Sequence, residues 1–553
     1  MAILSRYGAI RQNGGNHHRK FIGLVTNAAV VAALASSSSA GERPPSRGGR
    51  LRLRQVLVVH RHGDRTPITP MRDEEYWRAT LPDPTVLEGI ARGTSLLRPP
   101  GGGAANSHGA AGRGPFGQLT MMGLLQMVGL GERLRGELAG GHRDDEYDYG
   151  DDDGMAGLRL FTPEEPLHPS RVKVMSTDFP RTIQSVQALL AGLFPDHATG
   201  RDVDVDVDDA APIVIDVRNT NAYFIPDPQP RQHAAQLDLE RHLSDRPHLL
   251  EREGRLGALA RRVTEALEGH LGEGAGGVSF GIGEEKQHGG GDDAGEGEAA
   301  AGGGGEGDDV VRRRPRRRPL AWAQLCEVLV CLSSRGLLPP ALTEEDVAAV
   351  SGHVAWRWFE NLGHPVLARS AMWKFASGLV EEMSRKANED VVVVGPPRGG
   401  DAAEAGGSEA AAATPVGRER RKEEEPMLCI YSAHDSTLIG LLCVLGLEQP
   451  AEWPEYGSAL KLELLQEEAG GDGCVDERAE ALPRRHWVRF SLNGQVLRCK
   501  CIGDERNEPA SMVSLDQLAD LIHSEHELFN EDCESFDGSE LKYSWKDGLL
   551  SQH

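Results

Sequence analysis

The stretch "LVVHRHGDRTPITP", residues 57–70, decides the fold because an apolar run ends abruptly there in charged residues. The overlapping run "RQVLVVHRHG" is short and rich in β-branched residues, which is typical of a buried strand. Two histidines, two arginines and an aspartate stand at its end, and two prolines follow them. A buried strand that delivers so many ionisable groups to its end predicts a ligand site at that end.

The same pattern of strand, polar turn and helix occurs twice more along the chain. "RVKVMSTD" (171–178) precedes the helical run 181–194, and residues 426–447 repeat the pattern in one segment. After the first strand, residues 118–138 carry apolar residues at helical spacing, with Thr120 as a candidate cap. Three such units predict an α/β fold with a mainly parallel, doubly wound sheet flanked by helices. Sheets of this kind bind ligands at the carboxyl ends of their strands.

The composition limits the class of ligand. The chain has 553 residues and a formal net charge of -24 at pH 7. This charge argues against nucleic-acid binding, because a phosphate backbone needs a basic surface. An anionic small substrate would therefore need a local group of basic residues within an acidic protein. Eight cysteines form no dense disulfide framework and no paired CxxC motifs indicate zinc, so the redox compartment stays open.

The domain organisation follows from stretches without periodicity. Residues 98–115, the Gly/Glu-rich stretch 272–311 and residues 391–425 cannot bury enough apolar surface to offset the entropy of ordering. We therefore expect three disordered insertions. The units predicted around them are a first part of the α/β core at 51–225, a mainly helical cap region at 226–390, and a second part of the core at 426–553.

Two charged runs and a set of aromatics are open to two interpretations each. The runs "RRRPRRRP" (312–319) and "DVDVDVDD" (202–209) are expected to be solvated linker or loop rather than a polyanion patch or a calcium loop. Residues 321–390 carry aromatics that either pack in a helical core, which we favour, or line an apolar substrate groove. These are Trp356, Trp358, Phe359, Trp373 and Phe375.

The N-terminal residues 1–45 are expected to be a targeting leader, cleaved or disordered. Basic residues without any acidic one precede the apolar run 21–35, and Ala33 and Ala35 form an A-x-A cleavage motif. This pattern suits a secretory signal and a mitochondrial presequence equally. The apolar run is shorter than the ~20 residues that cross a bilayer, so it would serve membrane association rather than a permanent span.

The three strand ends together hold an inventory for phosphoryl transfer. Its members are Arg61, Arg65, Arg181, His62, His434 and Asp435. Guanidinium forks match the oxygens of a phosphate, and a histidine nitrogen can attack phosphorus. A nearby carboxylic acid can protonate the departing alkoxide. Gly63 is expected to let backbone and side chains crowd around a ligand, because it lacks a Cβ.

Four segments of the chain resemble the histidine acid phosphatases, the larger branch of the histidine phosphatase superfamily. They are "RHGDRTP", "FGQLTMMGLLQMVGLGERLR", "STDFPRTIQSVQALLAGLFPD" and "YSAHDSTLIGLLCVLGL". Within this family the chain is most similar to the lysophosphatidic acid phosphatase type, to which "WPEYGSALKLELLQ" (453–466) also corresponds. The resemblance runs from about residue 55 to about residue 525, interrupted by the insertions.

The resemblance implies a role for each residue of the inventory. His62 would be the nucleophile that forms a phosphohistidine, and Asp435 would donate a proton to the leaving group. The implied phosphate contacts are Arg61, Arg65, Arg181 and His434. No metal or other cofactor is expected, because the arginines supply the charge that magnesium supplies elsewhere. His60 receives no chemical role, and Asp64 is expected to be a structural hydrogen-bonding residue.

The sequence therefore predicts an acid phosphatase that hydrolyses phosphate monoesters, with lysophosphatidic acid or a similar monoester as substrate. A phytase or inositol-polyphosphate phosphatase is the alternative within the enzyme class, and a non-catalytic phosphate-binding module is the alternative outside it. We expect a monomer with no nucleic-acid partner, and a mitochondrial rather than a secretory location on the strength of the resemblance. Membrane association would come from the leader or from a lipid substrate.

Overall fold

A computed structural model describes the chain from residue 50 to residue 523, with gaps. The described residues are 50–98, 114–140, 158–162, 167–195, 197, 211–218, 243, 245–273, 275, 319–389, 425–450, 453–468, 485–503 and 509–523. The chain divides into two compact units, 1–41 and 42–553, and all described residues belong to the second. The predicted leader lies outside the described residues, as do almost all of the predicted insertions and both charged runs. The targeting role of the leader therefore stays a prediction.

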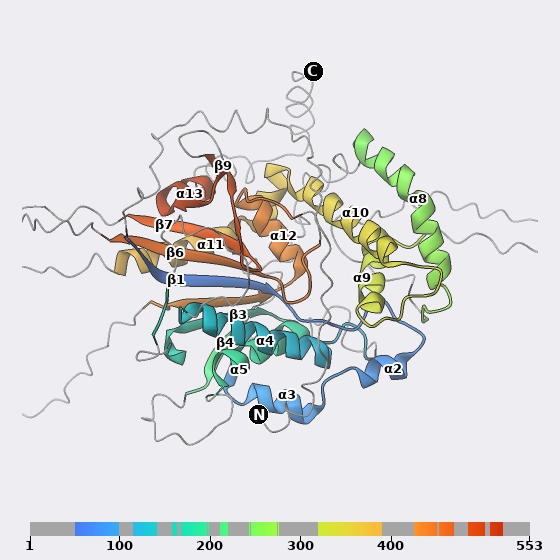
Figure 1. Ribbon diagram of the computed structural model, residues 1–553, viewed down its shortest axis with the longest axis horizontal. Helices are drawn as coiled ribbons and strands as arrows, with labels where there is room; N and C mark the ends of the chain where they lie inside the picture. Colours follow the sequence, from blue (N-terminus) through green and yellow to red (C-terminus); the bar gives the residue numbers. More distant parts are fainter. Residues whose placement is uncertain are drawn as a thin grey trace, which may run out of the picture. The chain divides into compact units, whose positions relative to one another are not determined.

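The centre of the described structure is a sheet of nine strands (Figure 1). Its strand order is β11-β7-β6-β1-β5-β3-β4-β2, with β8 paired to β7. The strands are β1 (Arg50–Arg61), β2 (Thr94–Leu97), β3 (Val172–Thr177), β4 (Ile213–Arg218), β5 (Leu428–Ala433), β6 (Ala459–Glu468), β7 (His486–Leu492), β8 (Gln495–Leu497) and β11 (Met512–Ser514). A separate pair is formed by β9 (Cys499–Gly503) and β10 (Pro509–Ala510).

The sheet is mixed, with a parallel half and an antiparallel half. Strands β1, β5, β3, β4 and β2 run parallel to one another, as the three strand-turn-helix units predict. Strand β6 pairs with β1 in the antiparallel sense, and β7, β8 and β11 continue in that sense. A tight turn joins β7 to β8 at Asn493 and Gly494, whose φ angles of 50° and 82° suit the Asn-Gly hairpin turn. The predicted α/β sheet is confirmed, and its parallel half carries the predicted strand ends.

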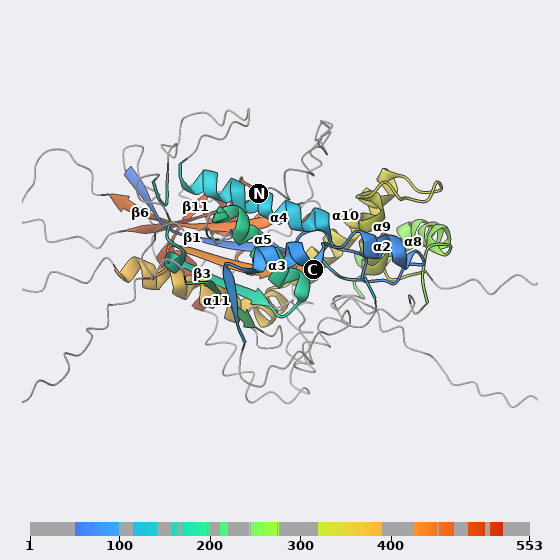
Figure 2. The same ribbon diagram turned by 90° about the horizontal axis from the view of Figure 1, so that it is seen from below.

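Helices cover both faces of this sheet. The helices among the described residues are α2 (Glu74–Ala79), α3 (Pro84–Ala91), α4 (Met121–Leu138), α5 (Pro180–Leu193), α8 (Pro247–Leu267), α9 (Trp322–Ser333), α10 (Glu344–Leu362), α11 (Pro365–Glu389), α12 (Asp435–Val444) and α13 (Leu515–His523). Figure 2 shows α4 and α5 on one side of the sheet and α11 on the other. Within β1, Val56 and Val58 pack toward α4 and α5, whereas Leu57 and Val59 pack toward α11 and α12. This alternation buries both faces, and it explains the continuous apolar run of the opening stretch.

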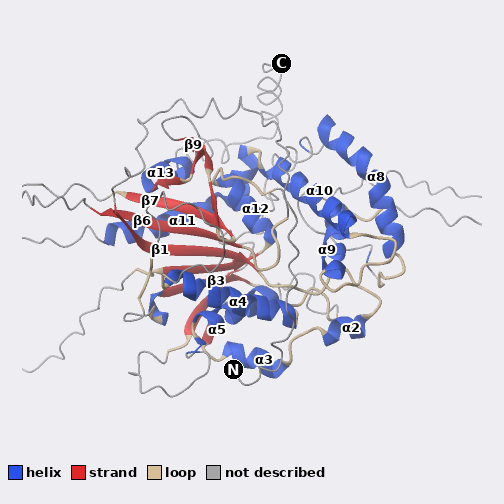
Figure 3. Cartoon of the chain, viewed as in Figure 1, coloured by secondary structure: helices blue, strands red, loops and turns tan. Residues whose placement is uncertain are grey.

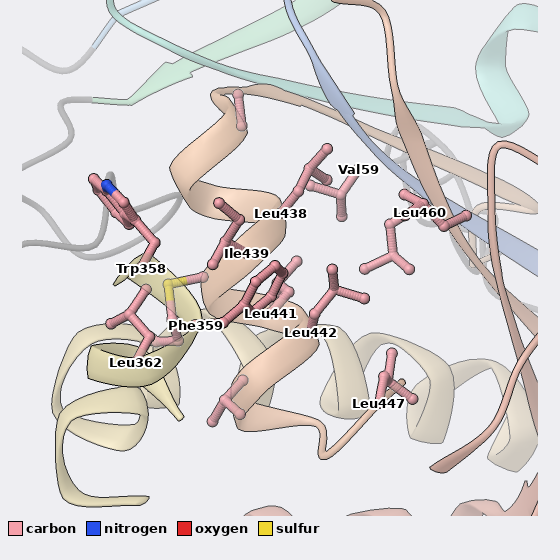
Figure 4. Close-up of a cluster of buried hydrophobic side chains, with 14 of the residues drawn as sticks. Val59, Trp358, Phe359, Leu362, Leu438, Ile439, Leu441, Leu442, Leu447 and Leu460 are labelled. Atoms are coloured by element: carbon pink, nitrogen blue, oxygen red, sulfur yellow. The ribbon is translucent and has the colours of Figure 1, made fainter. Parts of the chain in front are cut away.

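Helices α8, α9 and α10, which belong to the predicted cap region, lie beyond the carboxyl ends of the parallel strands (Figures 1 and 3). Helix α11, which the predicted cap region includes, contacts β1, α12 and α13. Trp358, Phe359 and Phe375 are buried in the core, as favoured from the sequence. Figure 4 shows Trp358 and Phe359 of α10 beside the apolar residues of α12, such as Ile439.

The cysteines that the structure describes are free thiols. None of the helices among the residues listed above combines the length and the apolar character needed to cross a bilayer.

Candidate active site

The three predicted strand ends meet at one place. Strands β1, β5 and β3 are adjacent and parallel, so the turns that follow Arg61, Ala433 and Thr177 lie at the same edge of the sheet. The described contacts join all six predicted residues through direct bonds or short-range charge interactions. Five of them are at most 8% exposed and the side chain of Asp435 is 21% exposed, so charge interactions here are stronger than at the surface.

His62 is held in one tautomer. Its Nδ1 lies 2.8 Å from the carbonyl oxygen of Gly63, which can only accept, so Nδ1 carries the proton and donates it. Burial, together with the positive charges of Arg181 and Arg61, holds the pKa of His62 well below its usual range. The imidazole therefore stays neutral in mildly acidic solution. Its Nε2 keeps a lone pair and can act as a nucleophile.

Asp435, at the start of α12, is surrounded by donors. Its Oδ2 lies 2.7 Å from Nη2 of Arg61 and accepts a hydrogen bond of 3.0 Å from the indole Nε1 of Trp453. Its Oδ1 accepts a hydrogen bond from the backbone N–H of Ser436. Burial raises the pKa of Asp435, but the charge of Arg61 and the bond from Trp453 outweigh it, and the net pKa lies below the usual value. The carboxyl is therefore ionised in the ligand-free protein.

Each of the three arginines is fixed by a different neighbour. The guanidinium of Arg61 lies 4.0 Å above the ring centre of Tyr456. Arg65 donates from Nη1 to Glu327 Oε2 at 3.1 Å, and both side chains are buried. Arg181, in the first turn of α5, stacks 4.5 Å over the ring of Phe179. Three permanently charged groups thus stand around His62 in fixed positions, as a phosphate site requires.

His434 precedes α12 and faces His62 edge to face, with ring centroids 5.7 Å apart. Burial first, and then the charge of Arg181, lowers its pKa to about 3, so that this ring is also neutral. Its Nε2 lies 3.3 Å from the hydroxyl of Thr177 at the end of β3. A neutral His434 can offer an N–H to a phosphate oxygen without adding charge to the site.

Gly63 is required by a helix rather than by a ligand. A Cβ at this position would stand 2.3 Å from the carbonyl oxygen of Gly123 in α4, and a Cβ on Gly123 would stand 2.1 Å from the carbonyl oxygen of Asp64. The expectation that Gly63 makes room for a ligand is therefore corrected. The backbone of the nucleophile turn packs directly against the first turn of α4, where Thr120 caps the helix as predicted.

Comparison with known proteins decides the family. The sequence model of the histidine phosphatase superfamily (branch 2) matches residues 52–242 and 370–493, which is more than half of the chain. The chain belongs to this superfamily. The resemblance inferred from the motifs is thereby confirmed, and all six candidate residues fall within the matched segments. Helices α8, α9 and α10 lie between the two segments, and the second segment begins inside α11.

Individual relatives of this histidine phosphatase are distant. Lysophosphatidic acid phosphatase type 6 of Bos taurus is 31% identical over 172 residues, which cover 29% of this chain and 35% of the relative. Lysosomal acid phosphatase of Homo sapiens is 29% identical over 158 residues, which cover 29% of this chain and 25% of the relative. The matches thus span about a third of the length of these relatives or less. The phytase structure of Citrobacter braakii aligns with a TM-score of 0.44 and 16% identity, over 86% of this chain and 98% of that one.

The sequence did not predict the residues that lie outside the strand ends and contact the site of this histidine phosphatase. Glu327 of α9 accepts hydrogen bonds from the backbone N–H groups of Ile68 and Thr69 as well as from Arg65. Trp453 and Tyr456 stand in the segment before β6, which the resemblance includes but which carries no ionisable group of the inventory. In the sequence they are two aromatic residues shortly before a buried strand. That pattern does not indicate which side chains they contact.

The two ionisable residues set aside in the sequence analysis have structural contacts. His60 is fully buried, its Nδ1 lies 3.1 Å from the carbonyl oxygen of Arg61, and burial lowers its pKa to about 4. Asp64 pairs with Arg335, two residues beyond the end of α9, and accepts a hydrogen bond from Thr120, as expected for a structural residue. Across the part of the chain that the structure describes, no group of three or more His, Cys, Asp or Glu side chains could hold a metal ion.

Proposed function

We propose that this protein hydrolyses phosphate monoesters through a covalent phosphohistidine on His62. The observation that carries the proposal is the state of His62: a buried, neutral imidazole with its proton on Nδ1, placed among three arginines at the edge of the sheet. Such a site attracts a dianion and presents a nucleophile to it. Membership of the histidine phosphatase superfamily supports the same reaction.

The proposed reaction has two displacements. The phosphate oxygens bind to Arg61, Arg65, Arg181 and His434. Nε2 of His62 forms a bond to phosphorus while the ester P–O bond breaks, and the proton of Asp435 passes to the departing alkoxide. In the second step the carboxylate of Asp435 takes a proton from water. The oxygen of that water bonds to phosphorus as the N–P bond breaks, and inorganic phosphate is released.

Substrate binding lets the carboxylate of Asp435 take up, from solvent, the proton that the first step transfers to the leaving group. In the free protein Arg61 helps to keep the pKa of Asp435 low. A bound phosphate offsets the positive charge of Arg61 and adds negative charge beside the carboxyl. Both effects raise the pKa of Asp435. Activity should fall as the pH rises through the raised pKa, because the leaving group then departs without a proton. We therefore expect a mildly acidic optimum.

Lysophosphatidic acid or a similar monoester is the substrate class that we propose. Relatives named for lysophosphatidic acid support it. A phytate site would need spare basic residues, but four of the six in residues 321–390 are paired with carboxylates. The pairs are Arg335 with Asp64, Arg357 with Glu253, Arg385 with Glu382, and Lys386 with Glu389. A non-catalytic phosphate-binding module would have no need for the proton donor Asp435.

A substrate panel on the full chain tests the proposal. Lysophosphatidic acid, phytate and p-nitrophenyl phosphate are offered to the wild type, to His62→Ala and to the control His523→Ala, whose residue lies at the exposed end of α13. We expect the His62→Ala variant to lose on the order of a thousandfold or more in turnover, as removal of a nucleophile does elsewhere, and the control to match the wild type. Equal turnover by wild type and His62→Ala would refute the mechanism. A preference for phytate would overturn the proposed substrate class.

A further inference from the structure

The segment before β6, residues 453–458, contacts both members of the ion pair formed by Arg61 and Asp435. Trp453 donates its indole N–H to Oδ2 of Asp435 at 3.0 Å, and this is the same oxygen that Arg61 contacts. The carbonyl oxygen of Pro454 accepts a hydrogen bond from Nη1 of Arg61. The ring of Tyr456 lies under the same guanidinium. Three neighbouring residues of one segment therefore fix both partners of the ion pair.

Trp453 is itself held by the cap region. Its ring meets the ring of Trp358 edge to face, with the centroids 5.7 Å apart and the planes at 83°. Trp358 is 8% exposed and packs in the large core beside α12. It belongs to α10, which lies outside the segments that match the superfamily. A chain of contacts thus runs from α10 through two indole rings to the carboxyl at the start of α12.

We propose that Trp453 is a positioning residue for Asp435, supported from α10 by Trp358. This inference rests on the proposed function. The indole N–H directs one carboxyl oxygen and stabilises the carboxylate, while the other oxygen is fixed by the backbone N–H of Ser436. When the ester bond breaks, the proton of Asp435 moves to the leaving oxygen, and the indole bond stabilises the carboxylate that this step creates.

The charges around Asp435 show why the indole matters. Arg61 from β1, Arg65 from the following turn, His434 from the preceding residue and the thiol of Cys326 from α9 all interact with this carboxyl. Phosphate binding weakens the electrostatic attraction of Arg61 and Arg65 for the carboxylate of Asp435, because the negative charge of the phosphate offsets part of their positive charge. Trp453 carries no charge and keeps its bond in every step. Together with the backbone N–H of Ser436, it is therefore an uncharged donor that still lowers the pKa of Asp435 when substrate is bound.

The test compares leaving groups in the full-length chain. A p-nitrophenolate leaves without help, whereas the alkoxide of glycerol 1-phosphate needs a proton. Trp453→Phe keeps the ring and removes the N–H. We expect about a tenfold fall in kcat for glycerol 1-phosphate, the size of a hydrogen bond to a charged group, and a change within about twofold for p-nitrophenyl phosphate. The descending alkaline limb of the kcat profile should move to higher pH, because loss of the donor raises the pKa of Asp435.

Trp373→Phe is the matched control. This tryptophan of α11 also donates its Nε1 to an oxygen, the backbone carbonyl of Ile522 in α13 at 3.2 Å. It should leave the leaving-group ratio and the pH profile unchanged. A second variant, Trp358→Leu, keeps the N–H of Trp453 but removes its support from α10. It should shift the leaving-group ratio in the same direction by a smaller factor.

The outcomes separate this inference from the proposed function. An active wild type with Trp453→Phe reduced equally on both substrates, at an unchanged pH profile, would overturn the positioning role alone. If Trp453→Phe does not fold, as judged by its thermal unfolding, an unchanged leaving-group ratio in Trp358→Leu would overturn the role of α10. A wild type that hydrolyses neither substrate, like His62→Ala, would overturn the proposed function first and this inference with it.

Discussion

Among the single residues of the site, Arg61 is the clearest case of a side chain that is preorganised for its ligand. Its guanidinium rests on the ring of Tyr456, contacts Asp435 and donates to the carbonyl of Pro454. A group held on three sides loses little freedom when phosphate binds, so more of the binding energy is available for the reaction. Tyr456 also lies beside the nucleophile, with its ring centroid 5.8 Å from that of His62.

Substitution of Tyr456 tests whether its ring preorganises Arg61 for phosphate binding. Tyr456→Phe keeps the ring under Arg61 and should stay within about twofold of the wild-type kcat/KM. Tyr456→Ala removes the ring, and we expect a loss of roughly tenfold, since a desolvated cation–π contact contributes about 1–2 kcal/mol. The measurement is steady-state hydrolysis of p-nitrophenyl phosphate. Equal activity of the two variants would show that the ring does not position Arg61.

At the scale of elements, α4 sets the distance between the nucleophile and the third arginine. Its Gly123 touches the backbone of the turn after β1, and a Cβ on its Gly131 would stand 2.0 Å from the carbonyl oxygen of Leu189 in α5. From the side of α5, a Cβ on Gly192 would stand 2.1 Å from the carbonyl oxygen of Val128. Two glycine contacts therefore bring α4 and α5 close, and Arg181 is the second residue of α5.

Two alanine substitutions within α4 should have opposite effects. Gly123→Ala places a methyl group against backbone atoms that cannot move aside, so we expect a loss of roughly 1–3 kcal/mol or more in the free energy of unfolding. Gly136→Ala, where a Cβ meets nothing within 4 Å, should stabilise the protein by about 0.5–1 kcal/mol. Denaturant unfolding of the two variants measures this difference. Equal stabilities would contradict the close approach of α4 to the nucleophile turn.

The elements also show what the sequence could predict. His62, Arg181 and Asp435 were predictable, because each follows a periodic strand and parallel strands bring their carboxyl ends together. Glu327 and Trp453 were not, because they come from elements whose position depends on how the cap region and the segment before β6 pack. The antiparallel half of the sheet did not follow from the three strand-turn-helix units, and its one local signal is the Asn-Gly hairpin turn at 493–494.

For the whole molecule, α9 ties the cap region to the site. Its Glu327 binds Arg65 and the turn beyond it, and its Arg335, two residues past the end of the helix, pairs with Asp64. The side chains of Arg335 and Asp64 are only 6% and 1% exposed. A buried ion pair of this kind fixes geometry more than it adds net stability, because desolvation offsets much of the attraction. Removal of one partner, however, leaves a buried charge.

Arg335→Leu should therefore destabilise the protein strongly. We expect a loss of about 3–5 kcal/mol, the typical cost of breaking a buried pair, measured by thermal or denaturant unfolding. The matched control is Arg78→Leu, because Arg78 pairs with Glu74 at the surface with side chains 60% and 51% exposed. That control should lose at most about 1 kcal/mol. Similar losses in both variants would mean that α9 is not anchored through Asp64.

The central claim is that His62 becomes covalently phosphorylated during turnover. The most direct measurement is to mix the wild type with a radiolabelled phosphate monoester, stop the reaction within its first turnovers in alkaline denaturant, and map the label by peptide analysis. The proposed mechanism predicts a label that is stable in alkali and lost in acid, located on the peptide that contains His62, and absent from His62→Ala. A wild type that turns over substrate without any label on that peptide would contradict the mechanism.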